Sequence, residues 1–130
     1  MTLVDANTVI HYLKGREPVV SRWKAASPRE LAIPAVAAYE VLYGMLQRGS
    51  PRRRSLGSEL LADLEQVPFD REAAHESARI RVELEARGLT IGPMDLLVAA
   101  TALSRGATLV TNNTKAFSRI KGLHLSDWTG

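Results

Sequence analysis

Three carboxylates stand alone among apolar residues at widely separated points of this 130-residue sequence. Asp5 follows a short apolar run, and Glu40 lies within a nearly apolar stretch with no basic residue three or four positions away. Asp95 is the only ionisable side chain between residues 91 and 103. Because a buried carboxylate without a partner costs several kcal/mol or becomes protonated, we expect compensation from elsewhere in the fold.

The chemistry that these residue types favour is the binding of a hard cation. Converging carboxylates without Cys or His are the ligand set of Mg²⁺ or Mn²⁺. The sequence has no cysteine, which excludes a disulfide scaffold, thiolate zinc sites and cysteine nucleophiles. The histidines, at positions 11, 75 and 124, are too far apart to form a local metal motif.

Each carboxylate also has a simpler explanation when it is taken alone. Asp5 is well placed as the N-cap of a following helix, which does not prevent metal binding. For Glu40 the alternative is a solvent-facing edge of its helix, which is less favoured because a nearly apolar helix is expected to be buried. Asp95 lies in the first turn of a helix opened by Pro93, where a negative charge interacts favourably with the helix dipole.

Polar residues follow the apolar run 107–110 at what we expect to be the same edge of the fold. In this TNN segment, Thr111 and Asn113 offer hydroxyl and amide oxygens that would orient a water molecule or bind a metal weakly. An ordinary Asn-rich turn is the alternative explanation for each of them.

Strands and helices are expected to alternate along the chain and to position these residues. We expect strands at 2–5, 30–34, 66–69, 107–111 and 123–128, helices at 6–14, 19–25, 34–48, 51–65, 93–104 and 114–119, and a long helix that Asp70 caps and that ends near Arg87. This alternation predicts one α/β domain, residues 1–130, with a mostly parallel sheet covered on both faces. Ligands of such folds bind at the carboxyl ends of the strands.

Charge is unevenly distributed behind a formal net charge of +3 and a sequence pI near 9.6. Acids dominate residues 59–85, whereas basic residues cluster elsewhere, and the candidates for contacting a polyanion are Arg52, Arg53, Arg54, Lys115, Arg119 and Lys121. Such a surface favours nucleic acid, the alternative being solvated helix faces and a loop. With seven aromatic residues and none within the Arg run, a base-stacking RNA module is not expected.

The N-terminal residues show no targeting or membrane signal. No basic region precedes their short apolar run, which Asp5 and Asn7 interrupt. We therefore expect a soluble cytoplasmic protein.

Four motifs, in order and spacing, resemble those of the PIN-domain ribonucleases. They are LVDANTVI around Asp5, PAVAAYEVLYG around Glu40, IGPMDLLVAATAL around Asp95 and TNNTKAFSRI near the C-terminus. Within that family the sequence is similar to the VapC toxins of bacterial type II toxin–antitoxin pairs, over essentially all 130 residues.

The resemblance implies a three-layer α/β/α fold and a Mg²⁺- or Mn²⁺-dependent endoribonuclease. Asp5, Glu40 and Asp95 match the family's acidic metal positions, and Asn7 and Thr111 match its polar supporting positions. A fourth acid is common in the family at or near the TNN segment, where this sequence has Asn113 and Ala116. Asn113 is nevertheless included among the expected catalytic residues, and whether one or two metal ions bind stays open.

The resemblance also implies a substrate and partners. Relatives with a TNNT segment are associated with cleavage of transfer RNA, which makes it the expected substrate. The expected partner is a VapB-type antitoxin whose tail covers the active site, and homodimers are common in the family. Tyr12, Leu13, Tyr43 and Leu46 are candidates for the antitoxin contact, with core burial as the alternative. Two other functions remain open: a non-catalytic RNA- or partner-binding protein of the same fold, and cleavage of branched DNA.

Overall fold

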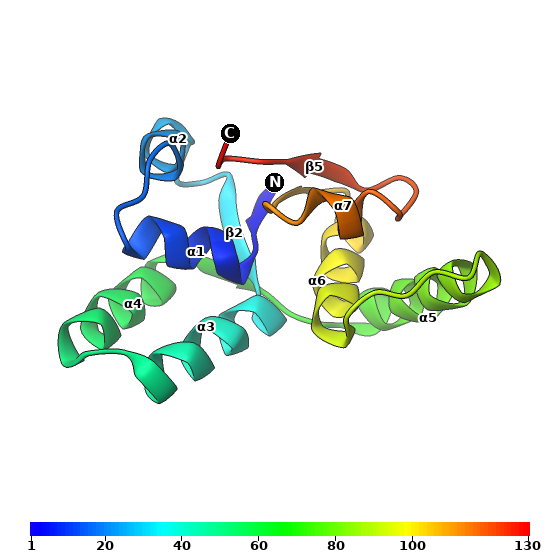
Figure 1. The fold of residues 1–130 in the computed structure, drawn as a ribbon, viewed down its shortest axis with the longest axis horizontal. Helices are drawn as coiled ribbons and strands as arrows, with labels where there is room; N and C mark the ends of the chain where they lie inside the picture. Colours follow the sequence, from blue (N-terminus) through cyan, green and yellow to red (C-terminus); the bar gives the residue numbers. More distant parts are fainter.

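A five-stranded parallel sheet forms the centre of the computed structural model, which describes residues 1–130 (Figure 1). The strands lie in the order β3-β2-β1-β4-β5 and pair only in parallel. Their bounds are β1 Thr2–Val4, β2 Leu31–Pro34, β3 Glu65–Val67, β4 Thr108–Val110 and β5 His124–Ser126. The predicted α/β class with a parallel sheet is therefore confirmed.

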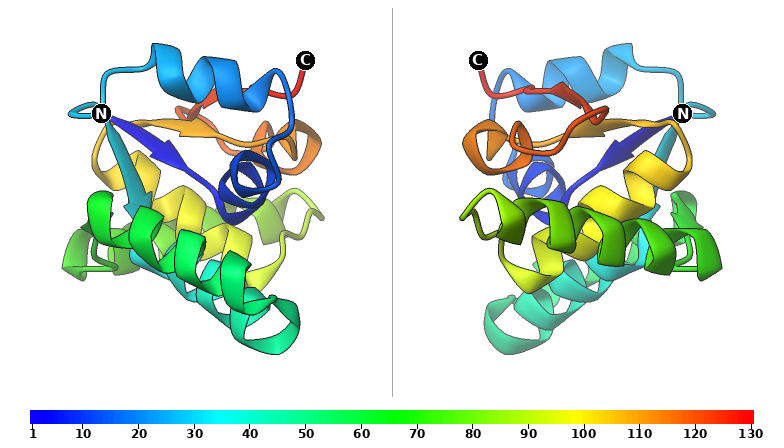
Figure 2. Two further views of the ribbon diagram at one scale, coloured as in Figure 1. Left: turned by 90° about the vertical axis from the view of Figure 1, so that its left-hand side faces the viewer. Right: turned by 90° about the vertical axis from the view of Figure 1, so that its right-hand side faces the viewer.

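Seven helices connect the strands and cover the sheet. They are α1 Ala6–Leu13, α2 Val19–Ala25, α3 Ala35–Arg48, α4 Pro51–Asp63, α5 Arg71–Ala86, α6 Pro93–Ser104 and α7 Thr114–Phe117. Helix α2 lies on one side of the central strands and α5 and α6 lie on the other, so the molecule has three layers (Figure 2). None of these helices has the length and apolar character needed to cross a membrane.

The core lies where the central strands meet α6. Leu3, Ile33 and Leu109 on β1, β2 and β4 are fully buried, as expected for short apolar strands covered on both faces. Helix α6 is nearly apolar, and small side chains such as Ala99 and Ala102 allow it to pack closely on the sheet and on α5. This packing fixes the beginning of α6, and with it Asp95, relative to the strand ends.

Two local features differ from the sequence-based expectations. Pro34 is not the first residue of a helix: it is extended (φ −60°, ψ 138°) and pairs with Val67, so α3 begins at Ala35. The third strand spans Glu65–Val67 instead of 66–69, because Pro68 has no N–H with which to continue the ladder.

Helix α3 also differs from the expectation that a nearly apolar helix is buried. Ala37, Ala38 and Val41 face the core, but a second row of apolar side chains is exposed. This row consists of Tyr39, Leu42, Tyr43 and Leu46, at spacings of three and four residues that place them on one helix face. The structure thus leaves an apolar stripe on the outside of α3.

Replacing Ile33 by Ala is expected to lower the free energy of unfolding by about 2–5 kcal/mol, because Ile33 is fully buried on a central strand and its truncation leaves a cavity. The exposed Val82 provides a control: Val82→Ala on α5 should change stability by less than about 0.5 kcal/mol. Urea denaturation followed by circular dichroism measures both. Equal effects of the two substitutions would contradict the assigned core.

Candidate active site

Asp5 lies directly after β1 and caps α1. The backbone N–H and the hydroxyl of Thr8 both donate to Asp5 Oδ1, at 2.8 and 2.7 Å, and the residue is 8% exposed. The capping explanation is therefore confirmed, but it occupies one carboxylate oxygen only. Oδ2 accepts no hydrogen bond within the protein, so it remains available for a ligand.

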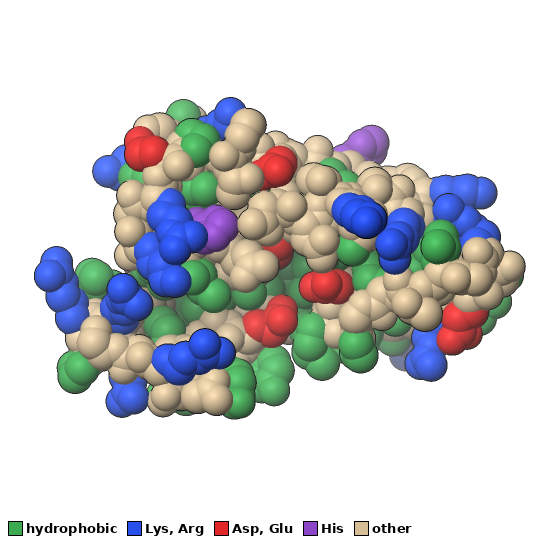
Figure 3. Space-filling view, viewed as in Figure 1, with side chains coloured by type: hydrophobic (Ala, Val, Ile, Leu, Met, Phe, Trp, Pro, Cys, Tyr) green, Lys and Arg blue, Asp and Glu red, His purple; other side chains and the backbone are tan.

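Glu40 and Asp95 are half-buried close to Asp5. Glu40 lies in α3, and Asp95 lies in the first turn of α6. Burial raises the pKa of Glu40 above its ordinary value, and the negative charges of Asp95 and Asp5 raise it further. Burial likewise raises the pKa of Asp95, and the charge of Asp5 adds to the effect. The three carboxylates that stand alone in the sequence are therefore brought together, and acidic side chains gather at the middle of this face between α3 and α6 (Figure 3).

The segment after β4 supports Asp95. The polar Asn113 side chain interacts with Asp95, which lowers the pKa of Asp95 and partly opposes the effect of burial. Asn113 is itself fixed, because its backbone N–H donates to the hydroxyl of the fully buried Thr111 at 3.0 Å. Thr111 thus orients the turn that carries Asn113.

The donor set of this site fits a divalent cation. No basic side chain forms an ion pair with Asp5, Glu40 or Asp95, so their negative charge is uncompensated within the protein. Oxygen ligands without nitrogen or sulfur match Mg²⁺ or Mn²⁺. In the present geometry no group of three His, Cys, Asp or Glu side chains is arranged to hold a metal ion. Because carboxylates of like charge repel one another, a cation between them would favour a closer arrangement.

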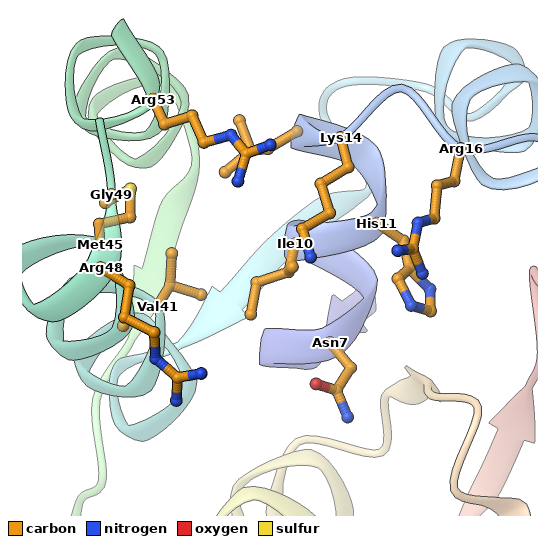
Figure 4. Close-up of a pocket in the computed structure, with 12 residues that line it drawn as sticks. Asn7, Ile10, His11, Lys14, Arg16, Val41, Met45, Arg48, Gly49 and Arg53 are labelled. Atoms are coloured by element: carbon orange, nitrogen blue, oxygen red, sulfur yellow. The ribbon is translucent and has the colours of Figure 1, made fainter. Parts of the chain in front are cut away.

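A groove of about 420 Å³ opens beside the carboxylates, between α1, α3 and α4. Asn7 lines its end and is exposed (Figure 4). The sequence analysis missed three basic residues of its lining, Lys14, Arg16 and Arg48. The sequence spacing could have identified Lys14, because it lies seven residues after Asn7 and therefore on the same side of α1.

The consecutive arginines of α4 have different surroundings. Arg53 lines the groove, and Arg52 is exposed without an ion pair or hydrogen bond of its side chain. Arg54 turns back to α3, where it donates to the carbonyl oxygens of Met45 and Leu46, both at 3.2 Å. Arg54 thus stabilises the carboxyl end of α3, where a positive charge also interacts favourably with the helix dipole.

The basic residues near the C-terminus also differ from one another. Lys115 is exposed on α7, and Lys121 lies 4.0 Å from Glu83. Arg119 Nη1 donates to the carbonyl oxygen of Thr90 at 2.8 Å, and Arg87 Nη1 donates to the carbonyl oxygen of Arg119 at 2.9 Å. Arg119 therefore links the segment after α7 to the loop that leads into α6.

The candidate antitoxin contacts divide into two pairs. Tyr12 and Leu13 pack against the core, and Tyr12 stacks on Trp23 with ring centroids 4.3 Å apart. Tyr43 and Leu46 are 56% and 69% exposed and belong to the apolar stripe on α3. Burial thus accounts for the first pair, whereas nothing within the chain covers the second.

A parallel α/β sheet with carboxylates gathered at its carboxyl edge is the architecture of a known class of nuclease domains, and comparison with known proteins identifies that class. The model of the PIN domain family matches residues 2–123. The chain belongs to the PIN domain family and, by its similarity along the whole length to the proteins described next, to the VapC ribonucleases within it.

Two relatives and two solved structures show this similarity. The "tRNA(fMet)-specific endonuclease VapC" of Salmonella typhimurium is 34% identical over 97% of this chain and 96% of its own, and the protein of the same name from Shigella flexneri is 31% identical over 98% and 97%. The structure of DNA-bound VapBC from Salmonella typhimurium matches with a TM-score of 0.90 and 31% identity, covering 98% of this chain and 97% of that one. VapBC2 from Rickettsia felis, bound to a promoter DNA fragment, matches with a TM-score of 0.88 and 29% identity, covering 98% of both chains.

Replacing Glu40 by Gln is expected to raise the thermal midpoint of the protein in chelator at neutral pH. Since the pKa values of Glu40 and Asp95 are raised, the folded protein binds protons more tightly than the unfolded chain. Stability from these groups is therefore present at acidic pH and declines as the pH rises through their folded pKa values. Gln removes one of the repelling charges, and the gain is below about 1 kcal/mol because the group is partly solvated.

Calorimetry between pH 4 and 8 measures this effect, and the gap between variant and wild type should widen with pH. Glu59→Gln, an exposed position on α4, is the matched control and should show no gap. A Glu40→Gln midpoint below that of the wild type at neutral pH would contradict the assigned repulsion.

Replacing Arg119 by Ala is expected to lower the free energy of unfolding by about 1 kcal/mol, because the substitution removes a hydrogen bond from a charged group. Lys115→Ala, which removes an exposed charge nearby on α7, should change it by less than about 0.5 kcal/mol. Urea denaturation compares the two. If Arg119→Ala leaves stability unchanged, the link to the loop before α6 does not contribute to the fold.

Proposed function

We propose that this protein is a Mg²⁺- or Mn²⁺-dependent endoribonuclease toxin of a toxin–antitoxin pair. Its reaction is the hydrolysis of RNA phosphodiester bonds by activated water, which leaves 5′-phosphate and 3′-hydroxyl ends. The observation that carries this proposal is the convergence of Asp5, Glu40 and Asp95, whose charges repel and have no cationic partner. The names of relatives that match over nearly their full length support the reaction class.

The residues that would hold the cation are Asp5, Glu40 and Asp95. A bound divalent ion supplies charge neutralisation at the phosphate and activation of a water molecule for in-line attack. Because this chemistry needs neither a 2′-hydroxyl nucleophile nor a pair of histidines, the absence of a His cluster is compatible with it.

The other residues of the site have positioning roles. Thr8 holds one oxygen of Asp5, so the second oxygen keeps a fixed direction. Asn113 lowers the pKa of Asp95 and so favours its ionised, ligand-binding form. Asn7 lies one turn or less from Asp5 at the start of α1, where its amide is available to substrate or water.

The fourth acidic position of the family is the main departure in this chain. Asn113 and Ala116 stand in and just after the TNN segment, where the family pattern often has a fourth acid. We therefore propose that the protein supplies carboxylates for one cation, and that a second ion, if used, depends on oxygen atoms of the substrate phosphate.

Transfer RNA is the proposed substrate, and a VapB-type antitoxin is the proposed partner. Support for the substrate comes from relatives named tRNA(fMet)-specific endonucleases, and support for the partner comes from similar chains solved in VapBC complexes. The exposed apolar stripe on α3 fits a protein contact of this kind. We further propose that residues 1–130 act as one PIN domain, within a homodimer, in the cytoplasm.

Replacing Asp5 or Asp95 by Asn is expected to slow RNA cleavage by at least about 100-fold, because each substitution removes a ligand of the cation. Asp63→Asn, at the exposed end of α4, is the matched control and should cleave like the wild type. The assay follows a labelled transfer RNA with Mg²⁺ and with chelator, and sequencing of the products identifies 5′-phosphate ends.

Two results would contradict the proposal. Cleavage by Asp5→Asn at the wild-type rate would show that the site is wrongly assigned. RNA binding by the wild-type protein without chelator-sensitive cleavage would instead support a non-catalytic PIN-fold protein, and digestion of a DNA strand of the same sequence tests the choice of nucleic acid.

A further inference from the structure

The groove between α1, α3 and α4 combines an apolar floor with a basic rim. Ile10, Val41 and Met45 contribute apolar side chains. Its charged lining residues are all basic. Three of them, Lys14, Arg48 and Arg53, extend over the gap between α1 and the α3–α4 pair (Figure 4). A ligand of this groove therefore carries negative charge together with an apolar surface.

The three rim side chains have no partner within the chain. Lys14, Arg48 and Arg53 are exposed, and none of them forms an ion pair or a side-chain hydrogen bond. Arg54, by contrast, is held by carbonyl oxygens at the end of α3. Three cations, one just after α1 and one each on α3 and α4, thus surround one hollow with their charges uncompensated.

The groove and the carboxylate site lie next to each other along α1. Asn7 lines the groove and lies two residues after Asp5, and Figure 4 shows its side chain at the end of α1 away from Lys14 and Arg53. A chain that crosses the carboxylates can therefore continue along α1 into the groove. Both regions would then contact neighbouring parts of one ligand.

We propose that this groove binds one unpaired nucleotide of the RNA, adjacent to the bond that is cut. Its flanking phosphates contact Lys14, Arg48 and Arg53, and its base or ribose rests on the apolar floor. The volume of about 420 Å³ lies within the range of about 300–1,000 Å³ that small-molecule pockets occupy. This inference rests on the proposed function and adds where the substrate strand lies on the protein.

A nucleotide suits the groove better than an acidic peptide does. RNA carries one charge per nucleotide and would reach the groove as a direct continuation of the strand at the carboxylates. An acidic peptide would bring additional carboxylates toward Asp5, Glu40 and Asp95, where negative charge is already uncompensated. The phosphate contacts would add affinity without base specificity.

The test measures RNA binding in the Asp5→Asn protein, which separates binding from cleavage. A fluorescent single-stranded RNA of ten nucleotides is titrated with this protein and with versions that also carry Lys14→Gln, Arg48→Gln or Arg53→Gln. Each groove substitution should weaken binding by about 3- to 10-fold and lower the slope of log Kd against log salt by about 0.7 for each phosphate that the variant no longer neutralises.

Arg29→Gln is the matched control, because Arg29 is exposed just before β2, at the amino edge of the sheet and so opposite the carboxylates. It should leave both the affinity and the salt slope unchanged. Thermal midpoints of all variants check that the fold is kept, which is expected because every substituted groove or control side chain is exposed.

The possible outcomes separate failure of the groove proposal from failure of the proposed function. Groove variants that bind RNA like the Arg29→Gln control, while the wild type cleaves RNA, would overturn the groove proposal alone. Variants that keep RNA affinity but bind the antitoxin more weakly would also overturn it and assign the groove to a peptide. Absence of both cleavage by the wild type and RNA binding by the Asp5→Asn protein would contradict the proposed function, and the groove proposal with it.

Discussion

Electrostatic repulsion among three carboxylates is the constraint on which the candidate site depends. Asp5, Glu40 and Asp95 come from three different parts of the chain. The charges of Asp5 and Asp95 raise the pKa of Glu40, and the charge of Asp5 raises the pKa of Asp95. The rigid packing of β1, α3 and α6 around the core keeps them together despite this repulsion. A cation bound between the three carboxylates would remove this repulsion and so would stabilise the folded protein.

The same scaffold places acidic and basic side chains on adjacent parts of the site. The carboxylates lie at the carboxyl edge of the sheet, where ligands of parallel α/β folds bind, and basic side chains from α1, α3 and α4 border them on one side. A polyanion would be attracted by the basic border but repelled by the carboxylates until a cation neutralised them. Helix α1 connects the two regions, because Asp5 caps it and Lys14 follows its last residue.

Local sequence signals predicted the sheet, most helices and the acidic site. The strands are short apolar runs, and the Asp70 cap and the start of α6 at Pro93 agree with the structure, since Ala73 N–H donates to Asp70 Oδ1 at 3.0 Å. The carboxylates were identifiable because no local partner neutralises them. Burial was less predictable: α3 is apolar on two faces, and only its tertiary contacts determine that Val41 is buried while Tyr43 is exposed.

Long-range contacts explain the parts that the sequence could not predict. The arginines at 52, 53 and 54 are alike in sequence, yet Arg53 reaches the groove and Arg54 bonds to α3, because α4 packs antiparallel against α3 at one particular rotation. Arg119, assigned to RNA from its charge, bonds to Thr90 through a contact 29 residues away in the chain. Charge alone therefore does not separate substrate-binding arginines from structural ones.

Calorimetric titration of Mn²⁺ into the protein tests the central claim most directly, because it measures cation binding independently of any RNA. The wild type is predicted to bind Mn²⁺, and the variant with Asp5→Asn, Glu40→Gln and Asp95→Asn together is predicted to show no binding while keeping its circular dichroism spectrum. Equal binding by the folded triple variant and the wild type would contradict the assignment of these three carboxylates as a metal site.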